Sequence, residues 1–193
     1  MERIVDVIYR VSYRMLCDRV DSENVTRRVL AEASGRSVVY DGSDTVTDWF
    51  LRRTCFHCRM MLVRRRMMWL LDSPSEVFVR ASPKVDDQDD YVTKQAWQVY
   101  CRAAFNMSPI QIAAYVLVVF EGLTADRAAS VLRLSRHRVE HLLDKATASI
   151  RGELAVYGSA GLYRNFVGFI MKVDEARKPQ AKDLLTEYSD SAP

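Results

Sequence analysis

The sequence lacks several features that would mark an enzyme or a membrane protein. It has no hydrophobic run of membrane-spanning length, and its 193 residues include only seven glycines, five prolines and three histidines. The glycines are scattered, so there is no glycine-rich phosphate loop, and Gly-x-Ser-x-Gly and His-Glu-x-x-His motifs are also missing. The histidines, His57, His137 and His141, leave little general-base chemistry. We therefore expect a protein that is not an enzyme, requires no cofactor and does not insert into a membrane.

Cysteine is scarce as well, and the start of the chain shows no secretory signal. The first residues follow an amphipathic helical pattern instead, with apolar side chains at Ile4, Ile8, Val11 and Met15. The four cysteines occupy helix-like positions among apolar neighbours, namely Cys17, Cys55, Cys58 and Cys101. Such positions suit reduced thiols better than a disulfide framework. We expect a cytoplasmic protein.

A metal site is the alternative explanation of the run Cys55-Phe56-His57-Cys58. His137 and His141, one helical turn apart, would have to supply the remaining ligands. The two groups lie far apart in the sequence, and the Cys-x-x-Cys falls within a helical pattern rather than on a zinc knuckle. We therefore expect no metal.

Charge is unevenly distributed, although the formal net charge is only +3. Residues 49–71 contain six arginines and no acidic residue, whereas residues 86–90 read Asp-Asp-Gln-Asp-Asp. The acidic run lies in a Pro- and Ser-containing stretch that we interpret as a flexible linker. Short β-branched patches at 37–40 and 77–80 are interpreted as loops. The predicted fold is all-α, with a helical domain (1–71), a linker (72–91), a second helical domain (92–153) and a helical tail (154–193).

Residues 107–151 follow the pattern of a helix-turn-helix. An apolar helix is predicted from Pro109 to Phe120 and is ended by Glu121 and Gly122. Thr124 can cap a short helix that carries Ala128, Ala129 and Leu132 on one face. Small residues there let a following helix approach closely. Arg133 stands in the turn where a left-handed residue, usually glycine, is often needed.

The last helix of this pattern has one apolar and one polar face. Ser135 can cap it, and its apolar stripe consists of Val139, Leu142, Leu143, Ala146 and Ile150. Polar side chains on the other faces are candidates for contact with duplex DNA, as in a recognition helix. These candidates are Arg136, His137, Arg138, Glu140, His141 and Lys145. A plain three-helix bundle is the alternative explanation of the stripes.

The arginine-rich segment predicts a second nucleic-acid surface. A helix that begins at Thr47 or Asp48 would bury Leu51, Cys55, Cys58 and Leu62. An adjacent stripe alternates aromatic, aliphatic and cationic residues, namely Trp49, Arg52, Phe56, Arg59, Val63 and Arg66. Aromatic rings can stack on unpaired bases while guanidinium groups hold phosphates, so this edge suits single-stranded nucleic acid. The alternative is a solvated basic face whose aromatic residues pack inward.

The order of these parts resembles the extracytoplasmic-function class of bacterial RNA polymerase sigma factors, over most of residues 4–151. The N-terminal match consists of Tyr-Arg-Val-Ser-Tyr-Arg-Met-Leu at 9–16, Asp18 and Asp-Ser-Glu-Asn-Val at 21–25. Residues 49–66 match the helix that opens with a Trp and ends in a basic run. The C-terminal match consists of Phe-Glu-Gly-Leu-Thr at 120–124, Ala-Ala at 128–129, Leu-Ser at 134–135, Val139 and Lys-Ala at 145–146.

The resemblance implies a transcription initiation factor that directs core RNA polymerase to promoter DNA. The first domain would contact the minus-10 element and the helix-turn-helix the minus-35 element, and an anti-sigma factor could be a further partner. It also implies a polymerase-binding surface at Asp21, Glu23, Asn24, Arg27 and Arg28. The last two replace the family's Gln and acidic residue, while Phe56 and Met60 replace an Asn and an acidic residue. The alternatives are a sigma-like protein-interaction module and a stand-alone helix-turn-helix regulator.

The tail predicts one more helix. Its apolar residues recur at three- and four-residue spacing within residues 161–177, at Leu162, Phe166, Phe169, Ile170 and Val173. Soluble monomers rarely leave such a face exposed, so we expect it to dock on one of the two domains or on a second protein. Docking that regulates access to the last helix is one hypothesis, and plain structural packing is the other.

Overall fold

The computed structural model describes residues 2–36, 43–69, 91–157, 166–168 and 170. Its main elements are α1 (Glu2–Leu16), α2 (Arg19–Gly35), α3 (Asp44–Trp69), α5 (Tyr91–Asn106), α6 (Pro109–Tyr115), the π-helix η1 (Val116–Phe120), α7 (Ala125–Leu132) and α8 (Arg136–Tyr157). Within these ranges every element is a helix, which confirms the all-α part of the predicted fold. None of the helices described is long and apolar enough to cross a membrane. The β-branched patches and nearly all of the predicted linker lie outside the described residues.

Helices α1, α2 and α3 pack against one another around the apolar face of α1. Asp18 begins α2 by accepting a hydrogen bond from the Asp21 backbone N–H at 2.8 Å. The prediction that α3 begins at Thr47 or Asp48 is wrong. Ser43 caps this helix, because its hydroxyl oxygen accepts from the Val46 backbone N–H at 3.3 Å. Thr47 lies inside the first turn, where its hydroxyl donates to the Ser43 carbonyl at 2.9 Å.

Between Pro109 and Leu132 the helices begin and end at the residues that the sequence predicts, whereas α8 continues to Tyr157, past the predicted end of the second domain at residue 153. Ser108 and Gln111 form a capping box at the start of α6, and the apolar segment continues through η1 to Phe120. Gly122 then adopts a φ of 69°. Thr124 caps α7 by accepting from the Arg127 N–H. These caps explain why the short helices between 109 and 132 stop and start within a few residues.

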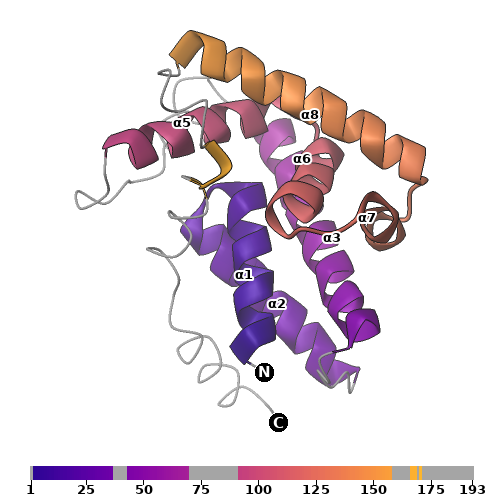
Figure 1. Cartoon of the computed structure of the whole chain (residues 1–193). Coiled ribbons are helices and arrows are strands. Elements are labelled where there is room, and N and C mark those ends of the chain that lie inside the picture. Colours follow the sequence, from indigo (N-terminus) through magenta and orange to yellow (C-terminus); the bar gives the residue numbers. More distant parts are fainter. Residues whose placement is uncertain (1, 37–42, 70–90, 158–165, 169, 171–193) are drawn as a thin grey trace.

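One continuous core joins the N-terminal and C-terminal helices. The Tyr13 ring on α1 stacks on Trp97 of α5 at 4.9 Å, and the Tyr100 hydroxyl donates to the Arg14 carbonyl at 2.7 Å. Figure 1 shows α8 lying across α5, α6 and α7, and it packs against all three. The described part of the tail joins the same core, since Phe166 and Ile170 are both buried. The rest of the predicted tail helix lies outside the described residues.

Candidate nucleic-acid interface

Helix α8 has the two faces that its sequence predicts. Its apolar side is buried at Val139, Leu142, Ala146 and Ile150, against α5, α6 and α7. Its exposed side chains include five of the six predicted duplex contacts, which are Arg136, His137, Arg138, His141 and Lys145. Glu140, the sixth, is half-buried. The first turns of α8 therefore present cations and imidazoles to solvent from a firmly packed helix.

Two acidic residues neighbour Arg136 on this face. Its Nε donates to Glu140 Oε1 at 2.8 Å, and a terminal guanidinium nitrogen lies 3.4 Å from Asp126 Oδ2. The hydrogen bond with Glu140 raises the pKa of Arg136, which stays cationic at any physiological pH. All three side chains are substantially exposed, and such pairs contribute little to stability. Arg136 can therefore exchange these partners for a phosphate or a base at small cost.

The turn before α8 contains Arg133, the residue for which the sequence predicts a left-handed conformation. Arg133 ends α7 in the left-handed conformation, with φ 55° and ψ 50°. The Leu134 N–H then donates to the Ala129 carbonyl at 2.9 Å, and the Ser135 hydroxyl oxygen accepts from the Arg138 N–H at 3.3 Å. Ala129 and Val139 are both buried where α7 and α8 pack. This geometry holds the N-terminus of α8 at a defined angle to α7.

The residues of the predicted single-strand surface on α3 differ in how far they are exposed to solvent. Its buried side is the predicted one, with Leu51, Cys55 and Cys58 in the core. Trp49 is half-buried and meets the Phe50 ring edge-on at 5.0 Å, so it packs against the core. On the same stripe Phe56 is 47% exposed and Val63 is 43% exposed, whereas Arg59 is half-buried. The expected alternation of exposed rings and cations is thus only partly realised.

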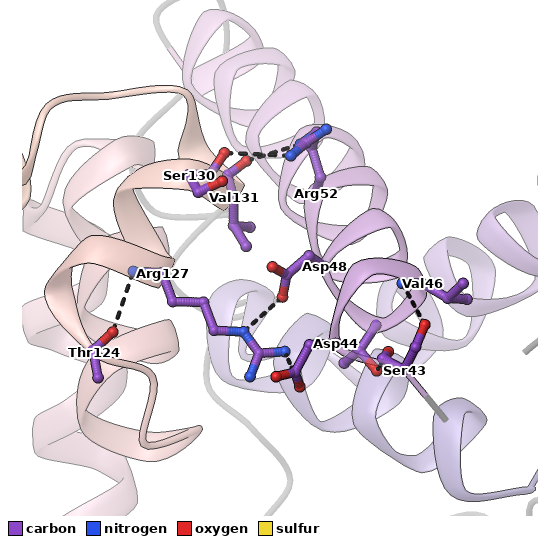
Figure 2. A network of polar contacts seen from close by, with 10 residues as sticks. Ser43, Asp44, Val46, Asp48, Arg52, Thr124, Arg127, Ser130 and Val131 are labelled. Carbon is purple, nitrogen blue, oxygen red and sulfur yellow. Dashed lines mark hydrogen bonds and ion pairs between the residues drawn. The ribbon is translucent and has the colours of Figure 1, made fainter. Parts of the chain in front are cut away.

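Two arginines of that stripe donate hydrogen bonds to backbone carbonyls of the C-terminal helices. Arg52 donates from Nε and from a terminal nitrogen to the carbonyls of Val131 and Ser130, each at 3.4 Å (Figure 2). These carbonyls lie at the C-terminal end of α7, where a cation is favourable. Arg66 donates to the carbonyls of Phe105, at 3.1 Å, and Met107. Both guanidinium groups therefore have partners within the chain.

A third arginine ties α7 to the start of α3. Figure 2 shows Arg127 reaching from α7 toward two carboxylates on the first turns of α3. Its guanidinium lies 2.8 Å from Asp48 and 2.9 Å from Asp44. Burial alone would lower the pKa of Arg127, but the hydrogen bond with Asp48 and the two negative charges raise it. Together with Arg52, this contact fixes α7 along the N-terminal half of α3.

The predicted polymerase contacts share helix α2 but differ in their surroundings. Asp21 is paired with Arg65 of α3. Glu23 accepts from Arg19 at 2.9 Å and lies 3.8 Å from Arg27. The two remaining residues, Asn24 and Arg28, are exposed. The surface offered by α2 is therefore carried mainly by Asn24, Arg27 and Arg28.

A partly buried polar group at α2 and α3 was not predicted from the sequence. His57 Nε2 lies 2.7 Å from Glu32 Oε1, and Arg53 pairs with the other carboxylate oxygen. Burial lowers the pKa of His57 more than the Glu32 hydrogen bond raises it, so a neutral ring donates its Nε2–H to the carboxylate at pH 7. Burial raises the pKa of Cys58 to about 12, as expected of an inert thiol. No cluster of three or more potential metal ligands occurs in the part of the chain that is described.

A second buried ionic group joins α1 to the end of η1. Glu121 accepts from Arg10 Nε at 3.0 Å and from Arg14 at 2.7 Å, and the Arg14 guanidinium lies over the Phe120 ring at 4.7 Å. The Arg14 and Glu121 side chains are only 2% and 5% exposed. The only signal in the sequence is a pair of arginines, one turn apart, in the largely apolar second half of α1.

Comparison of the chain with protein-family models, curated proteins and solved structures gives no match. The surface with the best-defined geometry is the exposed face of α8.

Proposed function

We propose that the chain is a DNA-binding transcription initiation factor of the sigma type. In this proposal α7 and α8 form a helix-turn-helix, and α8 lies in the major groove of duplex promoter DNA. The observation that carries it is the exposed cationic face at the start of α8, on a helix whose opposite face is buried. The left-handed turn at Arg133 and the cap at Ser135 support the same reading, since they orient that end of α8.

The exposed side chains of α8 have two roles in this proposal. Arg136, His137 and His141 contact base edges, where each good contact contributes about 1–3 kcal/mol of discrimination. Arg138 and Lys145 contact phosphates, which adds affinity for every sequence and makes binding depend on salt. Glu140 positions Arg136 through their hydrogen bond. Base recognition is thus concentrated in the first two turns of α8.

Contact with a melted minus-10 strand requires a change in this arrangement. Arg52 and Arg66 belong to the surface proposed for the single strand, but they donate to backbone carbonyls of the C-terminal helices. Their release needs the C-terminal helices to move away from α3.

The proposal is tested by selecting duplexes from a randomised pool and measuring their affinity by fluorescence anisotropy. Arg136→Ala combined with His137→Ala should remove the sequence preference, whereas Lys145→Ala should weaken all duplexes alike and reduce the salt slope by about one. Arg3→Ala, at an exposed arginine on α1, is the matched control and should change neither property. Unchanged affinity and preference in the double variant would contradict the proposal.

A second candidate function is a sigma-like protein-interaction module. The observation that favours it is a row of exposed apolar side chains along α3. At two positions of this row, Phe56 and Met60, the resemblance implies polar residues.

A further inference from the structure

Four apolar side chains on α3 are exposed along one line of the helix. Phe56, Met60, Val63 and Met67 are 47%, 55%, 43% and 63% exposed. Their spacing of four, three and four residues places them on a single face, which we call the apolar stripe. At a rise of 1.5 Å per residue, the stripe is about 16 Å long, or about three helical turns. Scattered apolar residues are normal on a surface, but a contiguous row marks an interaction site.

Positive charge borders the apolar stripe. Arg64 is exposed beside it, and Arg59 is half-buried between Phe56 and Met60 along the chain. No acidic residue occurs in the sequence between Asp48 and Asp72. Arg28 on α2 is exposed and close enough to His57 to lower the pKa of that histidine. A partner that covers the stripe therefore gains from negative charge at the edges of its own apolar face.

The side chains of the stripe favour a protein over a nucleic acid. Single strands bind through base stacking on aromatic rings, and Phe56 is the one ring in the stripe. The guanidinium of Arg53 already lies over that ring at 5.2 Å and is paired with Glu32. Met60 and Met67 are long, flexible and polarisable, which suits them to pack against the apolar side chains of a helix. A row of this length matches the contact face of one amphipathic helix.

We propose that the apolar stripe docks an amphipathic helix of a second protein, whose apolar face is flanked by acidic residues. The proposal goes beyond the function assigned to α8 and does not depend on it, because no residue of the stripe belongs to the duplex-binding face. Phe56 and Val63 belong to the predicted single-strand surface, so a partner helix on the stripe would exclude a single strand from these two residues. The partner helix would lie along α3 over the length of the stripe, with its carboxylates near Arg59 and Arg64.

The test uses the full chain and two labelled peptides of about 18 residues, long enough to match the stripe. Both peptides carry leucines at the spacing of the stripe, with flanking glutamates in one and flanking lysines in the other. The acidic peptide should bind at least about tenfold more tightly than the basic peptide. Met60→Ser combined with Met67→Ser should weaken it by at least about tenfold. Val20→Ser, at a valine that is 66% exposed on α2, is the matched control and should leave binding unchanged.

Three other outcomes would overturn the proposal. Equal binding of the two peptides, or binding of neither, would show that acidic flanks are not recognised. Tighter binding of an oligothymidylate, lost in the double Met variant, would assign the stripe to single-stranded nucleic acid. Self-association in analytical ultracentrifugation, abolished by the same variant, would show that a second copy covers it. Arg136→Ala with His137→Ala should leave peptide binding unchanged, so failure of the duplex-binding proposal is distinguishable from failure of this one.

Discussion

Removing the Glu121 carboxylate is the sharpest test of how the N-terminal and C-terminal helices are held together. Glu121 follows η1 and accepts hydrogen bonds from Arg10 and Arg14 on α1. Arg14 is among the most buried side chains of the described chain, so its charge depends on a nearby carboxylate. Glu121→Ala leaves both guanidinium groups in place and removes the carboxylate that neutralises them.

The expected loss is set by the buried member of this group. Breaking a buried ion pair by removing one partner costs about 3–5 kcal/mol, because the remaining charge stays desolvated and loses the attraction of that partner. Arg10 contributes little to this figure, since its side chain is 36% exposed and water screens it. The Arg14 contact therefore dominates, and Glu121→Ala should lower the free energy of unfolding by about 3–5 kcal/mol.

Urea denaturation followed by circular dichroism measures this difference. Arg14→Met combined with Glu121→Leu is the informative control, because replacing both charges with apolar groups should cost much less than removing one of them. A loss below about 1 kcal/mol for Glu121→Ala would refute the reasoning, since that is the size expected of an exposed pair. A double variant as unstable as the single one would show that packing, rather than charge, accounts for the loss.

Three further predictions concern other parts of the chain. Burial lowers the pKa of His57 below 6.5, so the unfolded chain binds more protons and stability should fall as the pH drops below 6.5. His57→Gln should flatten the pH dependence of the urea midpoint just below pH 6.5, and an unaltered slope would contradict this. Burial would raise the pKa of Glu32, but its hydrogen bonds lower it, so a further loss should appear below pH 4.5 in both proteins. Arg27→Gln with Arg28→Glu should tighten binding to core RNA polymerase in a pull-down without shifting the melting temperature. Strong binding by the unaltered chain and none by the double variant would contradict this prediction. Ile170→Ala should lower the free energy of unfolding by about 2–4 kcal/mol because Ile170 is buried in the core, and a change below about 0.5 kcal/mol would contradict this packing.

Local signals in the sequence predicted the C-terminal helices well. Thr124 and Ser135 are caps in the structure, and Val139, Leu142, Ala146 and Ile150 form the buried face of α8. These features depend on residues within one or two turns of each other, which is the range over which periodicity and capping chemistry act. The start of α3 was misplaced because Thr47 and Asp48 are as good at capping as Ser43, and the apolar pattern becomes regular only after them.

The contacts between distant segments could not be predicted from the sequence. Arg10 and Arg14 lie 111 and 107 residues from Glu121, and Arg52 lies 79 residues from Val131. An arginine that donates to a helix-end carbonyl has the same local pattern as one that faces solvent. The arginine-rich stripe therefore looked like a continuous exposed surface, whereas tertiary packing engages Arg52 and leaves Phe56 in solvent.

Transcription with core RNA polymerase tests the proposed function most directly. The chain is mixed with core polymerase and templates that carry the duplex sites selected by α8, and transcripts are mapped at their starts. The account predicts transcripts that begin at a fixed distance downstream of the selected site, are absent with core polymerase alone, and are lost with Arg136→Ala and His137→Ala. Binding of the chain to core polymerase without any site-dependent transcript would contradict it.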